Sequence, residues 1–179
     1  MFDVCIIGKG PAGISAALYI LRAGFKVVII GKDFGALEKA AAIDNYYGVA
    51  SLSGRQLAEI GVDQVKKLGA CIIEDEVVSI SYNNDFEIIS TNNKVLCKAL
   101  LLSTGSSRKV SAIKNLNRYE GSGVSYCAVC DGFFYRGKNV AVLGNGSYAM
   151  SECEHLLSFA NSVTVLTDGQ KPNAQLPNG

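Results

Sequence analysis

The feature that most constrains the fold is a strand, glycine turn, helix, strand pattern that occurs twice in the 179-residue chain. The first copy begins with the apolar run 4–7, and the second begins with the apolar run 140–143. Each copy closes with another apolar run, at 27–30 and at 163–166. Strands that alternate with helices in this way form parallel sheets. We therefore predict an α/β protein with two Rossmann-like units of the three-layer type.

The first glycine turn has the spacing of a dinucleotide-binding site. Gly8 would allow the tight turn, Gly10 would let a pyrophosphate approach the backbone, and Gly13 would permit close packing of helix on strand. Glycine turns without a ligand also follow strands, but a position between a strand and a helix favours dinucleotide binding. The acidic residue that usually holds a ribose after the second strand is missing, because Gly31 and Lys32 occupy that place.

The segment between the two copies predicts a sheet-rich connection. Residues 77–82, 86–90 and 99–102 are rich in branched and aromatic side chains and are separated by turn residues. Residues 52–68 have the apolar spacing of an amphipathic helix. This segment therefore belongs to a folded domain and is not a linker.

Cys127 and Cys130 are separated by two residues, so they can close into a small reversible disulfide. In a chain without a basic, apolar leader such a pair is more often redox-active or metal-binding than structural. Zinc would need two more ligands, and no second pair stands at metal spacing, so we predict a dithiol without a metal in a soluble, cytoplasmic protein. Cys5, Cys71 and Cys97 lie in or beside predicted strands, where they are expected to pack as small apolar side chains.

Charge and hydropathy exclude two other classes of protein. Seventeen basic and sixteen acidic side chains leave a net charge of +1, which is too small for backbone binding to nucleic acid. The longest apolar stretch is interrupted by Arg22, Gly24 and Lys26, so it does not predict a membrane span.

Several motifs together resemble the low-molecular-weight thioredoxin reductases, a family of flavoproteins, and the resemblance covers the whole chain. It rests on GKGPAG at 8–13, IDNYYG at 43–48, LSG at 52–54, STG at 103–105 and GVSYCAVCDGFF at 123–134. The last of these segments is the most specific. The resemblance implies a thioredoxin-disulfide reductase with FAD as cofactor, thioredoxin as partner and a homodimeric assembly.

The same resemblance implies a domain division and a set of site residues. Residues 1–113 would form an FAD-binding domain without its C-terminal return segment, and 114–179 would begin an NAD(P)-type domain, so the chain would not be the whole working enzyme. Cys130 would lie nearer the flavin, Cys127 would exchange with thioredoxin, and Asp131 would move the proton. The implied cofactor-binding residues are Gly8, Gly10, Pro11, Ala12, Gly13, Gly31, Lys32, Asn45, Val77, Thr104 and Gly105.

Two residues of the second unit depart from the pattern of family members that use NADPH, which carry histidine and arginines after the second strand. Here Asp168 occupies that region and would repel a ribose phosphate, although a carboxylate could still accept hydrogen bonds from the ribose of NADH. Tyr148 stands at the helix start, where a small residue usually lets a pyrophosphate approach. Both departures favour the branch of the family that takes electrons from ferredoxin.

Three alternatives remain open from the sequence. A thioredoxin reductase that uses NADPH or NADH would show flavin bleaching by the nicotinamide. An oxidase of similar fold that makes disulfides in small molecules would consume oxygen. A non-enzymatic, incomplete redox module would do neither.

Overall fold

The computed structural model describes residues 1–106 and 113–175, which belong to two compact units, Met1–Ser111 and Ala112–Gly179. The first unit is built on a six-stranded sheet with the order β3-β2-β1-β6-β5-β4. Its strands are β1 (Phe2–Ile7), β2 (Val27–Ile30), β3 (Cys71–Ile73), β4 (Val77–Asn83), β5 (Asp85–Ser90) and β6 (Lys94–Leu102). The strands from β3 to β6 in this order run parallel, whereas β5 and β4 add antiparallel pairs at one side.

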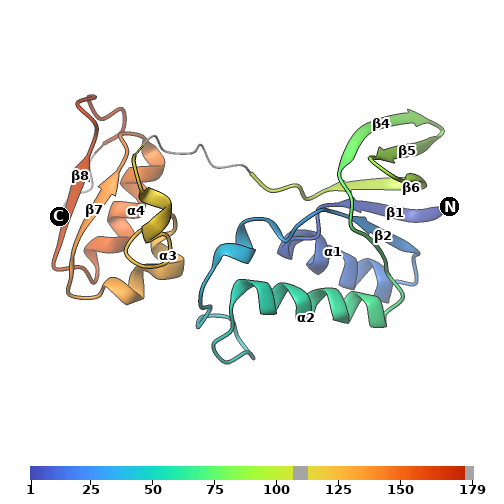
Figure 1. The fold of residues 1–179 in the computed structure, drawn as a ribbon, viewed down its shortest axis with the longest axis horizontal. Helices are drawn as coiled ribbons and strands as arrows, with labels where there is room; N and C mark the ends of the chain where they lie inside the picture. The colour runs from blue at the N-terminus through green and yellow to red at the C-terminus, as the bar shows by residue number, and fades with distance from the viewer. Residues whose placement is uncertain (107–112, 176–179) are drawn as a thin grey trace. The chain divides into compact units, whose positions relative to one another are not determined.

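Helices cover one face of the parallel strands. Figure 1 shows α1 (Pro11–Arg22) and α2 (Gly54–Lys67) on the same side of the sheet, with the β4–β5 hairpin curling towards the other side. Pro11 suits the first turn of α1, where its missing N–H would have no helical partner. Ser53 and Gln56 form a capping box that begins α2. The 3₁₀ turn η1 (Gly35–Lys39) lies between β2 and α2 in the chain.

The two faces of the sheet carry separate apolar cores. Alternate strand residues such as Ile6 and Ile29 pack with α1 and α2, through partners that include Val62. The other face packs Cys5 and Val28 against β5 and β6. All four residues of β2 are buried, as expected for a strand covered on both faces.

Asp75 ties the connection after β3 to the turn between β5 and β6. Its carboxylate accepts hydrogen bonds from the Ser90 hydroxyl at 2.7 Å, the Asn92 N–H at 2.8 Å and the Asn93 side-chain amide at 2.8 Å. These bonds, with that from Ser90 the largest cause, hold the pKa of Asp75 well below its usual range. The aspartate is therefore satisfied although it is buried.

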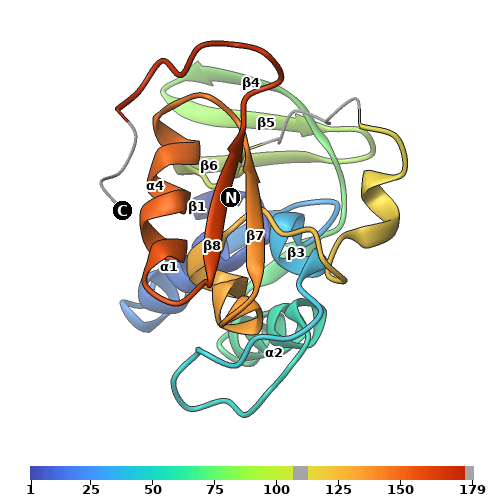
Figure 2. The same ribbon diagram turned by 90° about the vertical axis from the view of Figure 1, so that its left-hand side faces the viewer.

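The second unit carries a parallel pair of strands, β7 and β8, with one helix between them in the chain. Figure 2 shows α4 beside both strands. The elements are η2 (Leu116–Tyr119), α3 (Ala128–Asp131), η3 (Gly132–Tyr135), β7 (Asn139–Leu143), α4 (Ser147–Leu157) and β8 (Ser162–Leu166). In the part of the chain that the structure describes, no helix has the length and apolar character needed to cross a membrane.

The internal repeat predicted from the sequence is confirmed at the level of single hydrogen bonds. The N–H of Gly8 donates to the carbonyl of Ile30 at 2.8 Å, and the N–H of Gly144 donates to the carbonyl of Leu166 at 2.9 Å. Each turn is thus fixed to the end of the neighbouring parallel strand by the same bond. The predicted α/β class with parallel strands is correct.

One expectation from the sequence was incomplete and another is wrong. The sequence indicated a strand at or beside Cys71 but gave no bounds for it, because the three residues of β3 are too few to give a periodic pattern. The expectation that Cys71 is packed is wrong, since this residue begins the sheet's outermost parallel strand and is exposed. Cys5 and Cys97 are buried, as predicted.

Candidate cofactor cradle and redox site

The first candidate site lies where the carboxyl ends of parallel strands meet. Gly8 follows β1, Gly31 follows β2, and Thr104 and Gly105 come shortly after β6. In an open α/β sheet, ligands bind in the crevice outside this edge. The structure therefore brings five of the predicted residues, counting Lys32 after Gly31, to the edge at which a dinucleotide would bind.

The glycine turn is packed too tightly to accept larger residues. A Cβ on Gly13 would overlap the carbonyl oxygen of Gly8 and would lie 2.6 Å from the Ser103 hydroxyl. That hydroxyl donates a hydrogen bond to the carbonyl of Ile7 at 2.9 Å and lies 3.1 Å from the carbonyl oxygen of Gly8. Gly8 itself has a φ of 111°, which side-chain-bearing residues rarely adopt. Ser103 of the segment after β6 therefore helps to fix the turn, and sequence reasoning missed it.

The start of α1 is open to an anion. Gly10 is the residue before the helix, no side chain in the described residues caps it, and Pro11 and Ala12 form the first helical positions. Free N–H groups and the helix dipole at such an end favour a phosphate. The turn and the helix start therefore fit the pyrophosphate of a dinucleotide such as FAD.

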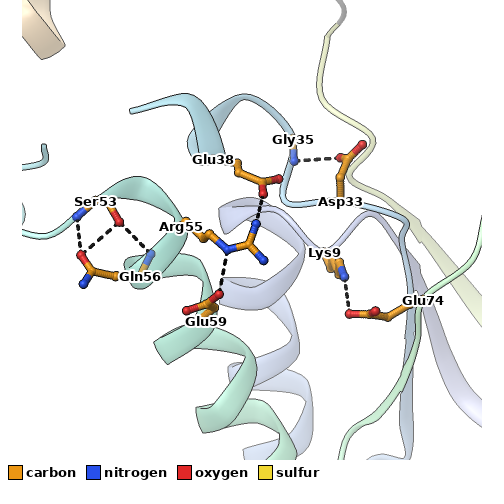
Figure 3. A network of polar contacts seen from close by, with 9 residues as sticks. All are labelled: Lys9, Asp33, Gly35, Glu38, Ser53, Arg55, Gln56, Glu59 and Glu74. Carbon is orange, nitrogen blue, oxygen red and sulfur yellow. Dashed lines mark hydrogen bonds and ion pairs between the residues drawn. The ribbon is translucent and has the colours of Figure 1, made fainter. Parts of the chain in front are cut away.

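Lys9 lies next to Gly31, and Figure 3 shows its side chain directed at Glu74. A Cβ on Gly31 would lie 2.8 Å from the Lys9 backbone nitrogen and 3.1 Å from its Cγ. Lys9 is only 4% exposed, and its Nζ lies 2.6 Å from Oε1 of Glu74 and 4.8 Å from the centre of the Phe34 ring. The hydrogen bond from Lys9 lowers the pKa of Glu74. The buried ammonium group of Lys9 therefore belongs to the glycine turn itself. The Lys9 backbone lies against Gly31, where many dinucleotide-binding domains carry an acid for the ribose.

Three further predicted residues, Lys32, Val77 and Asn45, make no hydrogen bond or ion pair with the glycine turn among the described residues. Lys32 is exposed and its Nζ contacts Oε1 of Glu76 at 2.8 Å, which raises the pKa of Lys32. Val77 begins β4 directly after Glu76 and packs against the core. Asn45 lies on the exposed segment between η1 and α2, and among the described residues it makes no hydrogen bond to the glycine turn. The structure thus pairs Lys32 with Glu76, the residue before Val77, but it does not join Asn45 to the glycine turn.

The second candidate site is a disulfide between Cys127 and Cys130, whose Cα atoms are 5.3 Å apart. Cys127 is half-buried and directly precedes the one-turn helix α3, whereas Cys130 within that helix is exposed. The N–H of Cys130 points at the Cys127 sulfur at 3.2 Å. Cys130 is therefore the more exposed of the two residues within this unit.

Ser125 connects the disulfide to the predicted proton-moving residue. Its hydroxyl donates a short hydrogen bond to Oδ2 of Asp131 and accepts one from the N–H of Cys127 at 3.2 Å. The N–H of Asp131 donates to the carbonyl of Cys127 at 3.1 Å. The Ser125 hydroxyl and the helical turn together thus hold the Asp131 carboxylate in a fixed position. Sequence reasoning missed Ser125, although a serine six residues before an acid and two before a cysteine was a visible signal.

Helix α4 also contacts the disulfide segment. The hydroxyl of Tyr148 donates to the carbonyl of Tyr126 at 2.9 Å, and the carboxylate of Glu152 accepts a hydrogen bond from the N–H of Ala128. The hydroxyl of Tyr126 donates to Glu120 at 2.7 Å. Neither Glu152 nor Glu120 could have been assigned to this site from sequence spacing.

The second glycine turn has polar groups of its own nearby. Asp168 follows β8 in a left-handed conformation with a φ of 53°, within a turn closed by the N–H of Gln170 and the carbonyl of Thr167 at 3.1 Å. The side-chain amide of Asn145 donates to the side-chain carbonyl of Gln170 at 2.8 Å. The turn after β8 is therefore fastened to the glycine turn by side chains.

Comparison with known proteins identifies relatives across almost the whole chain. The family model for pyridine nucleotide-disulphide oxidoreductases matches residues 2–177. The chain is 36% identical over 179 residues to a thioredoxin reductase of Aquifex aeolicus, covering 97% of this chain and 55% of that protein. A solved thioredoxin reductase of Streptococcus pyogenes is 34% identical, with a TM-score of 0.89 over 98% of this chain and 58% of that one. The chain thus spans about half the length of these relatives.

A further solved relative is described as an atypical thioredoxin reductase, from Desulfovibrio vulgaris Hildenborough. It is 37% identical, with a TM-score of 0.56, and the match covers 99% of this chain and 60% of that one. Matches of this extent agree with the parallel-sheet fold described above.

Proposed function

Because this chain belongs to the pyridine nucleotide-disulphide oxidoreductase family, we propose that it acts as a thioredoxin reductase. The proposed activity transfers electron pairs from FAD through the Cys127–Cys130 dithiol to the disulfide of thioredoxin. The observation that carries the proposal is the closed disulfide with the Asp131 carboxylate held beside it by Ser125. The division of labour follows the predicted domains, with FAD on 1–113 and the dithiol on 114–179.

The cofactor is FAD, which supplies two-electron transfer to a disulfide when it is bound. Gly8, Gly10 and Gly13 would hold its pyrophosphate against the start of α1, and this assignment rests on the space that a Cβ would fill. Gly31, Lys32 and Val77 would lie towards its adenosine part. The other proposed contacts are those of Pro11, Ala12, Asn45, Thr104 and Gly105.

Exchange with thioredoxin follows from thiol chemistry. Two electrons and two protons convert the Cys127–Cys130 disulfide into two thiols. The Cys127 thiolate then attacks the thioredoxin disulfide, which forms a mixed disulfide and releases one thioredoxin thiolate. Cys130 attacks Cys127 in turn, which restores the internal disulfide and releases thioredoxin as a dithiol. Asp131 would take the proton from one thiol and return it to the departing sulfur.

For the electron donor we favour reduced ferredoxin. Asp168 places a carboxylate where the phosphate of NADPH would need a cation, and Tyr148 places an exposed ring at the start of α4. The named relatives do not by their names identify a donor. We further place the enzyme in the cytoplasm as a homodimer, without nucleic acid or membrane partners.

A second donor is supported by a specific observation. The turn at Gly144 keeps the hydrogen bond to Leu166 that the first turn makes to Ile30, so its backbone retains a nucleotide-binding form. An enzyme that uses NADPH or NADH is therefore the alternative.

Anaerobic flavin absorbance tests both the activity and the donor. The purified protein is mixed in turn with reduced ferredoxin, NADPH and NADH, with oxidised thioredoxin present as acceptor. We expect ferredoxin alone to bleach the flavin and to produce thioredoxin thiols. Rapid bleaching by a nicotinamide would overturn the donor assignment, and bleaching without any thioredoxin thiol would overturn the proposed function.

A further inference from the structure

Two side chains of α4 hold the backbone on both sides of Cys127. The Tyr148 hydroxyl binds the carbonyl of Tyr126, which belongs to the peptide bond before Cys127. The Glu152 carboxylate binds the N–H of Ala128, which belongs to the peptide bond after it. Tyr148 and Glu152 are four residues apart and so lie on the same face of α4, and this face hydrogen-bonds to both peptide groups.

The two contacts differ in strength. The Tyr148 side chain is 67% exposed, so its neutral hydrogen bond is worth little in water. Glu152 is half-buried and offers a charged acceptor, and such hydrogen bonds are about twice as strong as neutral ones. Glu152 therefore carries most of the contact between α4 and the disulfide segment.

The Glu152 carboxylate also brings a negative charge to the peptide group that follows Cys127, whose sulfur becomes negative when it reacts. A like charge close to a thiol disfavours its ionised form. Other charged groups around this segment are Asp131, held through Ser125, and Glu120, held through Tyr126, while Arg136 and His155 line a pocket beside Ala128. Among them, Glu152 is bonded to the residue adjacent to Cys127.

We propose that Glu152 is a positioning residue for the redox dithiol, which fixes the Cys127 backbone through the Ala128 N–H and restrains ionisation of the Cys127 thiol through its charge. Tyr148 assists as the weaker second contact. The inference rests on the proposed function for its role in turnover, but its effect on the thiol needs neither flavin nor thioredoxin. Tyr148 would then have a structural role near the disulfide that is separate from any effect on nucleotide binding.

Three variants separate the hydrogen bond from the charge. Glu152→Gln keeps an oxygen acceptor for the Ala128 N–H and removes the charge, whereas Glu152→Ala removes both. Glu154→Gln is the matched control, because Glu154 is exposed on the same helix and makes no polar contact among the described residues. Each protein is reduced with dithiothreitol, freed of the reductant and alkylated with iodoacetamide across a pH series, and mass spectrometry follows the peptide that contains Cys127.

We expect the midpoint of Cys127 alkylation to move to lower pH by about half a pH unit or more in both Glu152 variants, and to stay in place in Glu154→Gln. Thioredoxin reduction should fall about tenfold in Glu152→Ala and less than about threefold in Glu152→Gln. A Glu152→Gln profile that overlays the wild type would overturn the charge role. Full turnover in Glu152→Ala would overturn the positioning role. If wild type itself fails to reduce thioredoxin, the proposed function fails, and the alkylation profile still decides whether the Glu152 charge restrains ionisation of the Cys127 thiol.

Discussion

The hydroxyl of Ser125 lies between the Asp131 carboxylate and the backbone N–H of Cys127, donating to the first and accepting from the second. The serine thereby sets the position of Asp131, the acid that follows Cys130 in the chain. A carboxylate that moves protons must be within hydrogen-bond reach of its partner, so loss of this restraint should appear in kinetics before it appears in stability.

Ser125→Ala and Asp131→Asn should each slow thioredoxin reduction. We expect a loss of severalfold in Ser125→Ala and a larger loss, of about tenfold or more, in Asp131→Asn, because only the second removes the acid itself. Bound flavin should be unchanged in both, since neither residue lies in the glycine cradle. Stopped-flow measurement of dithiol and flavin exchange checks the order of the two effects. An Asp131→Asn variant with an unchanged rate would refute the role of Asp131.

Gly13→Ala and Gly10→Ala should separate folding of the cradle from cofactor binding. A Cβ on Gly13 overlaps the Gly8 carbonyl, so this variant should lose both thermal stability and FAD. A Cβ on Gly10 meets only the Phe34 carbonyl oxygen at 3.6 Å, so this variant should keep its melting temperature and lose FAD alone. The flavin-to-protein absorbance ratio and a thermal melt give the two readouts. Full flavin content in Gly10→Ala would contradict the proposed approach of the pyrophosphate.

Asp75→Asn should make the protein less stable at neutral pH but not at low pH. The folded-state pKa of Asp75 lies below that of the unfolded chain, which is about 3.9, so its hydrogen bonds stabilise the protein above that pH. As the pH falls through the folded pKa this contribution is lost. We expect the variant to melt several degrees below wild type at pH 7, with the difference shrinking below about pH 4.

The matched control for this series is Asp63→Asn, which changes an exposed aspartate of α2. Its melting temperature should follow that of wild type at every pH. A difference between Asp75→Asn and wild type that stays constant from neutral to acid pH would show that the charge of Asp75 is not the source of its effect.

Thiol labelling of the oxidised protein should single out Cys71. This cysteine is exposed, whereas Cys5, Cys97 and Cys153 are buried. Burial raises the pKa of the Cys5 thiol to about 12 and also raises those of Cys97 and Cys153, so these three should remain unreactive thiols. We expect one rapid equivalent of label in the native state, absent from Cys71→Ser. Rapid labelling of Cys97 would show that the sheet core opens.

The elements that the sequence predicted well are those with strong local signals. The glycine turns at Gly8 and Gly144 were predicted because a glycine spacing between a strand and a helix has few other uses. The structure adds the matching bonds to Ile30 and Leu166, which join residues distant in the chain. Boundaries were less accurate. The apolar positions that indicate the first helix start at Ile14, whereas the helix itself begins at Pro11, because its first turn consists of glycine-motif residues.

The parts that could not be predicted depend on contacts across space. Glu152 of α4 contacts Ala128 of α3, and Lys9 after β1 contacts Glu74 after β3. The number of residues between the two members of each pair does not match any known sequence motif. Cys71 was misplaced for a related reason, since a strand residue is buried only if its neighbours cover it, and β3 is the outermost parallel strand.

The close contact between Lys9 and Gly31 limits the substitutions that these two positions can accept during evolution. A Cβ at position 31 would lie 2.8 Å from the Lys9 backbone nitrogen, which requires the backbone to shift, and 3.1 Å from the Lys9 Cγ, which is a tight contact, so a single substitution to an acid there is strained. A shift of the turn would relieve the first contact, and a shorter residue at position 9 would relieve the second. The two sites should therefore covary among descendants of this sequence, with a long residue at one position accompanied by glycine at the other. Attempts to engineer a ribose-binding acid into this cradle should begin from the double substitution.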